Sequence, residues 1–128
     1  MVFKMSQFPK KQRLSSEKSI EKLFCYGASI LEGPFRAVWS LEENNDDNFV
    51  KVLIIVSKKR LKLAVDRNTM KRRIKESYRL NKNKLECCLD KGNQQLHLAI
   101  IYQKEEILDY MLLDKKINLL LDRLIKDL

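Results

Sequence analysis

The chain has 128 residues and a formal net charge of +9, from 26 Lys and Arg against 17 Asp and Glu. With 45% hydrophobic residues and only three Gly and two Pro, it has the composition of one folded domain, not of a disordered or collagen-like chain. No apolar run is long enough for a membrane span or an export signal, so we expect a cytoplasmic protein without a membrane partner. Cys25, Cys87 and Cys88 have the spacing of neither a disulfide framework nor a metal site, and we expect reduced structural thiols.

The first half of the chain is predicted to contain one helix and two strands. Residues 1–14 are basic and irregular, which predicts an extended basic arm. Ser15 or Ser16 then caps a short amphipathic helix. Alternating side chains over residues 35–41 predict a half-buried strand, and the β-branched run 49–56 predicts a second strand that pairs with it in antiparallel fashion.

The second half is predicted to contain two helices around a third strand. Asp66 or Asn68 is expected to cap a helix that extends towards Gly92. Its expected apolar stripe consists of Met70, Ile74, Ser77 and Tyr78. Residues 96–102 predict a strand, and the leucines of residues 108–128 have helical spacing. The sequence therefore predicts a single α+β domain over residues 1–128, a two-layer sandwich with the order α-β-β-α-β-α.

The positive charge is concentrated in one segment. Residues 58–79 hold ten basic and two acidic side chains, so 10 − 2 = +8 of the net +9 lies within this segment. A solvated surface helix normally mixes both signs of charge to gain ion pairs and avoid repulsion. A polyanion offsets the repulsion by releasing its counterions, which makes nucleic acid the first candidate partner and an anionic membrane surface the second.

The chain offers few residues for chemistry of its own. Its one histidine, His97, lies between two leucines of the predicted strand, and we expect it to be a structural residue satisfied by hydrogen bonds. The acidic residues between 42 and 47 suit a polar hairpin loop, and the three glycines have no phosphate-loop spacing. The sequence therefore predicts a binding protein with no catalytic residues and no metal ligands, whose chemistry is supplied by another molecule.

The basic string VSKKRLKLAVDRNTMKRRIKESYRL resembles the signature of the bacterial ribonuclease P protein component. The residues that carry this resemblance are Ser57-Lys58-Lys59, Ala64-Val65, Arg67-Asn68 and Lys71-Arg72. Arg13-Leu14 and the end of the first helix at Leu23-Phe24 are similar to the family's opening, so the resemblance covers nearly the whole chain. Three positions depart from the family pattern, namely Thr69 and Lys75 in place of arginine and Tyr78 in place of phenylalanine.

The resemblance implies a ribonucleoprotein in which a catalytic RNA, with Mg²⁺ held mainly by that RNA, removes the 5′ leader of precursor tRNA. The protein would be a non-catalytic subunit, with a left-handed β-α-β crossover in its fold. Residues implied to bind the catalytic RNA are Arg13, Ser57, Lys58, Lys59, Arg67, Asn68, Lys71, Arg72, Lys75 and Arg79. Residues implied to line a cleft for the single-stranded leader are Ile20, Phe24, Arg36 and Val38, of which Ile20 stands where the family often has an aromatic residue.

Three other functions remain open at this point. The first alternative is a ribosome-associated or regulatory RNA-binding module with no role in tRNA cleavage, which fold and charge alone would allow. A helix-turn-helix DNA regulator is disfavoured because the basic helix carries phosphate-binding cations and few side chains that read bases. A nuclease that acts alone is disfavoured because the sequence shows no cluster of metal ligands.

Overall fold

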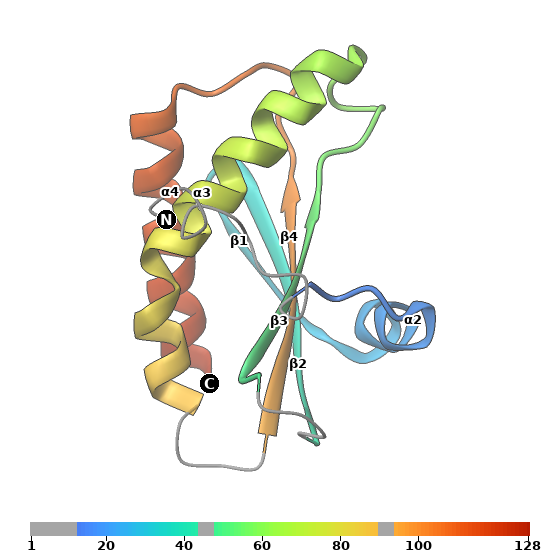
Figure 1. The fold of residues 1–128 in the computed structure, drawn as a ribbon, viewed down its shortest axis with the longest axis vertical. Coiled ribbons are helices and arrows are strands. Elements are labelled where there is room, and N and C mark those ends of the chain that lie inside the picture. The colour runs from blue at the N-terminus through green and yellow to red at the C-terminus, as the bar shows by residue number, and fades with distance from the viewer. Residues whose placement is uncertain (1–12, 44–47, 90–93) are drawn as a thin grey trace, which may run out of the picture.

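The computed structural model describes residues 13–43, 48–89 and 94–128 (Figure 1). Of the predicted basic arm, residues 1–12 lie outside this described part. The elements follow in the order α2, β1, β2, β3, α3, β4 and α4. Their bounds are α2 Glu17–Tyr26, β1 Ala28–Glu32, β2 Phe35–Glu43, β3 Val50–Ile55, α3 Ala64–Leu89, β4 Gln94–Tyr102 and α4 Tyr110–Asp127. The α+β class and every predicted element are confirmed, with one strand added to the expected order.

The added strand is β1, which forms a hairpin with β2. The two strands pair in antiparallel fashion from Ala28 opposite Trp39 to Glu32 opposite Phe35. Gly33 makes the turn with a φ of 56°, a left-handed conformation that glycine adopts without strain. β1 escaped prediction because only Ile30 of its five residues is buried, while Leu31 is exposed, so the strand shows no apolar alternation.

The four strands form one mixed sheet in the order β1-β2-β4-β3. The predicted antiparallel pairing of residues 35–41 with residues 49–56 is wrong, because β4 lies between β2 and β3 and pairs with both. β2 is antiparallel to β1 and β4, whereas β3 and β4 run parallel and are joined through α3. The parallel pair requires such a crossover connection. The left-handed turn of that connection stays a prediction.

Helices cover both faces of the sheet, which adds a third layer to the predicted two. Figure 1 shows α3 and α4 side by side on one face and α2 on the other. The main core lies between the sheet and the helix pair, and it includes Phe35, Leu98, Ile74 and Leu120. A small second core beneath α2 consists of Leu14, Leu23, Val38 and Ala99. Because both faces of β4 are covered, its side chains from residue 95 to 100 are all buried.

The helix α3 begins earlier than predicted, because neither Asp66 nor Asn68 caps it. The first helical bonds run from the backbone N–H groups of Asp66 and Arg67 to the carbonyl of Leu63, each at 3.1 Å. Leu63 therefore occupies the cap position of α3. The apolar stripe predicted for this helix is confirmed, since Met70, Ile74, Ser77 and Tyr78 are all buried.

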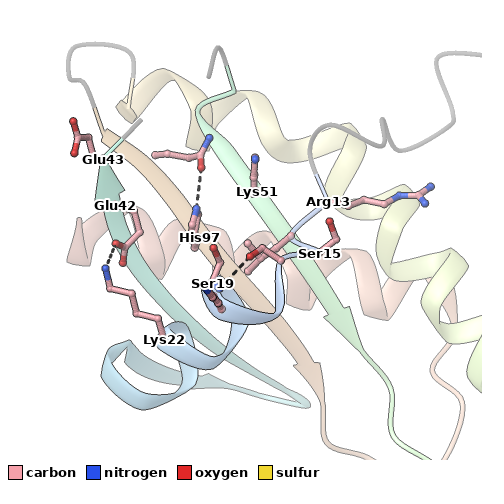
Figure 2. A pocket seen from close by; sticks show the side chains of 12 residues that line it. Arg13, Ser15, Ser19, Lys22, Glu42, Glu43, Lys51 and His97 are labelled. Atoms are coloured by element: carbon pink, nitrogen blue, oxygen red, sulfur yellow. Dashed lines mark hydrogen bonds and ion pairs between the residues drawn. The ribbon is translucent and has the colours of Figure 1, made fainter. Parts of the chain in front are cut away.

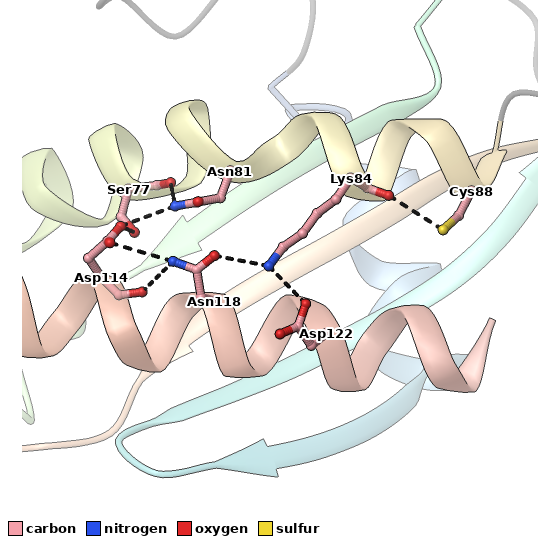
Figure 3. A network of polar contacts seen from close by, with 7 residues as sticks. All are labelled: Ser77, Asn81, Lys84, Cys88, Asp114, Asn118 and Asp122. Atoms are coloured by element: carbon pink, nitrogen blue, oxygen red, sulfur yellow. Dashed lines mark hydrogen bonds and ion pairs between the residues drawn. The ribbon is translucent and has the colours of Figure 1, made fainter.

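A polar network fixes the second half of α3 to α4 (Figure 3). The Ser77 hydroxyl donates to Asp114 Oδ1 at 2.6 Å, and the Asn81 amide donates to the same oxygen at 3.1 Å. Further along, Lys84 Nζ donates to Asn118 Oδ1 at 2.9 Å and pairs with Asp122 Oδ1 at 2.8 Å. This network holds α3 in place from its C-terminal half, so its basic N-terminal half is presented on a fixed support.

Candidate RNA-binding surfaces

The basic segment begins in a turn after β3 whose backbone is well ordered by hydrogen bonds. The N–H groups of Arg60 and Leu61 both donate to the Ser57 carbonyl at 3.1 Å, and the Ser57 hydroxyl accepts from Arg60 N at 3.3 Å. Leu61 is buried in the main core and anchors the turn. Lys58 and Lys59 are exposed at its tip. Ser57 therefore stabilises the turn, and the two lysines expose their positive charges at its tip.

The side chain of Arg67 braces the same turn from inside α3. Its Nη1 atom donates to the carbonyls of Leu61 at 2.8 Å and Lys62 at 2.9 Å. A guanidinium can hold both carbonyls at once because its N–H donors lie in a fixed plane. Arg67, expected to bind RNA directly, thus also positions the turn that carries Lys58 and Lys59.

The outer side of α3 presents cations next to its buried stripe. Asn68 and Arg72 are exposed, and Lys71 is half-buried beside them. At the departure from the family pattern, the Thr69 hydroxyl donates to the Val65 carbonyl at 2.9 Å. Thr69 therefore supplies no cation, and its hydroxyl is used within the helix.

Two cations, Arg13 and Lys71, act electrostatically on Lys75 of α3. The chain at Arg13 and Leu14 runs parallel to β3, with Leu14 N donating to the Val52 carbonyl at 2.9 Å. Burial lowers the pKa of Lys75 below its ordinary value, and the neighbouring charges of Arg13 and Lys71 lower it further. A polyanion bound beside Lys75 would favour the charged form of this lysine.

The remaining arginines of the helix are engaged by the protein. Arg79 Nε pairs with Glu76 Oε1 at 2.8 Å, and its Nη2 reaches Glu76 Oε2 at 3.3 Å. Arg73 Nη1 donates to the Leu108 carbonyl at 2.6 Å, which ties α3 to the loop before α4. Arg79, expected to contact RNA, therefore lies within an ion pair whose acid offsets its charge.

The depressed pKa of Lys75 predicts a pH dependence of RNA binding. A phosphate bound at Lys75 would raise this pKa again, so RNA binding takes up protons. The affinity for RNA therefore falls as the pH rises through the pKa that Lys75 has in the free protein, which lies below 10.5. We expect Lys75→Arg to keep its affinity in this alkaline range, because arginine stays charged. The check is RNA affinity at constant salt from neutral pH to about pH 9.5, below the ordinary lysine pKa. Equal losses for both proteins would show that Lys75 meets no phosphate.

The opposite face of the sheet carries the residues expected to line a leader cleft. On α2, Ile20 is half-buried against the second core, whereas Phe24 keeps 44% of its surface exposed. Arg36 is exposed on β2, and its Nε donates to the Ser29 hydroxyl at 2.9 Å. Val38 lies on the same face, but it is 3% exposed and packs against Leu23. Val38 thus supports α2 from below, and its side chain offers no surface to a ligand.

Near the N-terminal end of α2, a pocket of about 480 Å³ opens between the helix and the sheet (Figure 2). At the helix end, Ser16 Oγ accepts from Ser19 N at 3.4 Å. Lys22 Nζ pairs with Glu42 Oε1 at 2.8 Å, and this bond lowers the pKa of Glu42. The residues that line the pocket are Arg13, Leu14, Ser15, Ser16, Lys18, Ser19, Lys22, Glu42, Glu43, Lys51, Gln95 and His97. Four of these twelve side chains are Lys or Arg and two are Glu, so cations outnumber acids in the pocket.

Most of the pocket was missed by the sequence prediction. His97 is buried, and its Nε2 lies 2.8 Å from Gln95 Oε1, which confirms the structural role expected for this histidine. Strand alternation could have predicted part of this pocket. Gln95, His97 and Lys51 point to the α2 side of the sheet, and the residues between them on β3 and β4 enter the main core. Among the described residues, no three His, Cys, Asp or Glu side chains gather into a group that could hold a metal ion.

A small α+β domain with a basic helix on one face of its sheet, and a pocket rich in cations under a separate helix on the other (Figure 1), has the features of an RNA-binding protein. The family described as Ribonuclease P matches residues 8–125. The ribonuclease P protein component of Porphyromonas gingivalis is 30% identical over 106 residues, covering 83% of this chain and 77% of the relative. That of Chlorobaculum tepidum is 33% identical over 102 residues, covering 74% and 66%. The chain belongs to the ribonuclease P protein family.

Solved structures agree on the fold. The RNase P protein of Staphylococcus aureus is similar with a TM-score of 0.66 and 21% identity, covering 88% of this chain and 94% of that one. The RNase P protein of Thermotoga maritima gives a TM-score of 0.64 and 24% identity, with 87% and 96% covered. The family assigns the chain as a protein subunit of ribonuclease P, a ribonucleoprotein endoribonuclease of tRNA processing, with the RNA subunit as its partner.

Proposed function

We propose that this subunit binds two RNAs with two separate surfaces. The surface formed by the Ser57–Arg60 turn and the outer side of α3 meets the phosphates of the catalytic RNA. The α2 side of the sheet, with Phe24, Arg36 and the pocket near His97, receives the 5′ leader of precursor tRNA. The observation that carries the first assignment is the concentration of ten basic against two acidic side chains within residues 58–79, with Lys58, Lys59 and Arg72 exposed.

The second assignment is supported by the chemistry of the α2 face. A single-stranded leader has unstacked bases and phosphates, and it requires apolar surfaces beside cations. Phe24 and the half-buried Ile20 offer apolar surface, and Arg36, Lys18 and Lys51 offer charge on the same side of the sheet. A single strand fits this face better than a duplex, because the apolar side chains suit splayed bases and not the edges of paired bases.

The reaction itself is proposed to belong to the RNA subunit. Mg²⁺ would be held mainly by that RNA, since the basic segment of the protein, residues 58–79, carries ten cations against two acids and would repel a divalent cation. The bound ion supplies stabilisation of developing charge at the phosphodiester. No described helix is long and apolar enough to cross a membrane. We propose a cytoplasmic location for this subunit.

The leader assignment is tested with Arg36→Ala in the reconstituted ribonucleoprotein. We expect weaker binding of leader-bearing precursor tRNA and little change for mature tRNA, because Arg36 faces only the leader. Arg36 is exposed, and among the described residues its side chain bonds only to the Ser29 hydroxyl. The fold should therefore persist in this variant. Ser29→Ala, which removes that bond and keeps the cation, serves as the control. An equal loss for both tRNAs would place Arg36 outside a leader site.

A further inference from the structure

Two exposed apolar side chains stand at the start of α3, within the most basic segment of the chain. Leu63 is 62% exposed and Val65 is 66% exposed. They are surrounded in sequence by the exposed cations Lys58, Lys59 and Lys62. Figure 1 shows this end of α3 projecting beyond the strands.

Leu63 is an unfavourable residue for its position. It occupies the cap of α3, since its carbonyl accepts the first helical bonds. Caps favour Ser, Thr, Asp or Asn, whose side chains accept a further N–H bond, and a leucine there forgoes roughly 1 kcal/mol of helix stability. A local rule broken at an exposed site, without a gain within the fold, indicates a role in binding.

The backbone around the pair is held by other residues. Arg67 bonds the carbonyls of Leu61 and Lys62, and the Thr69 hydroxyl bonds the carbonyl of Val65. Leu61, and not Leu63, enters the main core from this loop. The side chains of Leu63, just before α3, and Val65, in its first turn, are therefore exposed on a backbone that other residues hold.

The surrounding charge identifies the class of partner. Residues 58–79 hold ten basic and two acidic side chains, which favours a polyanion over a protein groove. Folded RNA also exposes unstacked bases and riboses in its loops and bulges, and these pack against apolar side chains. We propose that Leu63 and Val65 contact an unstacked nucleotide of the catalytic RNA, while the neighbouring lysines bind its phosphates. This inference rests on the proposed function of the α3 surface.

The test is the double variant Leu63→Asn/Val65→Ala. Asparagine is a better cap than leucine and alanine a better helix former than valine, so thermal stability should be equal or higher. Affinity for the catalytic RNA should nevertheless fall by about five- to thirtyfold, the cost of leaving that apolar contact unmade. The slope of log affinity against log salt should not change, because no charge is removed.

Two further variants make the outcome specific. Met111→Ala/Leu112→Ala removes two exposed apolar side chains from the first turn of α4 and should leave RNA affinity unchanged. Lys58→Ala/Lys59→Ala should weaken binding and flatten the salt slope. Wild-type affinity in the Leu63→Asn/Val65→Ala protein would overturn the apolar contact. If Lys58→Ala/Lys59→Ala also binds as wild type, the α3 surface itself is wrongly assigned, so the two failures are distinguishable.

Discussion

Replacing Lys71 and Arg72 together with alanine should weaken binding of the catalytic RNA by about tenfold or more for each phosphate that the protein no longer binds. Both lie on the outer side of α3, with Arg72 exposed and Lys71 beside Lys75. The slope of log affinity against log salt should flatten by roughly 1.4 to 1.8, which is two phosphates at about 0.7 to 0.9 each. Titration of the catalytic RNA at several salt concentrations measures both quantities.

The matched control is Lys115→Ala/Lys126→Ala. This variant removes the same charge from exposed positions of α4, away from the proposed surface. Its salt slope should stay at the wild-type value, which separates local phosphate binding from a general effect of net charge. An unchanged slope in Lys71→Ala/Arg72→Ala would contradict contact between these side chains and the RNA backbone.

Replacing Phe24 with alanine should cost the ribonucleoprotein about 1–3 kcal/mol of affinity for leader-bearing precursor tRNA, the range typical for removal of one base-stacking side chain. The ring is 44% exposed on α2, so its removal opens no large cavity in the fold. Mature tRNA lacks the leader and should bind as before. Competition between precursor and mature tRNA for the same ribonucleoprotein measures the ratio of the two affinities directly.

Tyr26→Ala is the matched control for Phe24→Ala. It removes an aromatic side chain from the end of the same helix, where the ring is 83% exposed. Tyr26 lies outside the residues assigned to the leader face, and its removal should change neither affinity. The leader-stacking role of Phe24 would be refuted by precursor affinity within about twofold of wild type, or by an equal loss with Tyr26→Ala.

Much of the fold was predictable because its elements have strong periodic patterns. The stripe from Met70 to Tyr78 has helical spacing and is buried as expected. The same holds for Leu113, Ile117, Leu120, Leu121 and Leu124 of α4. β1 was not predictable, since its one buried side chain gives no alternation. The start of α3 was also missed, because the cap rule selects Asp66 or Asn68 and the chain uses Leu63 instead.

The basic segment indicates the surface that we propose for RNA, but the sequence did not show which of its cations bond within the protein. Arg67 braces the preceding turn and Arg79 pairs with Glu76, and both arrangements depend on side-chain geometry that spacing does not reveal. Strand alternation correctly placed Val38 on the same face as Arg36. It did not show that α2 covers Val38 and leaves Arg36 exposed, because the position of a helix on a sheet depends on three-dimensional packing.

The most direct test of the account is cleavage of a 5′-extended precursor tRNA at low Mg²⁺ by this protein mixed with its cognate catalytic RNA. Each component is omitted in turn, and Lys71→Ala/Arg72→Ala replaces the wild-type protein in a parallel reaction. We predict cleavage that requires the RNA, is restored by the protein and is reduced by the double variant. Cleavage by the protein without RNA would contradict the non-catalytic role, and failure to assist the RNA would leave only a general RNA-binding module.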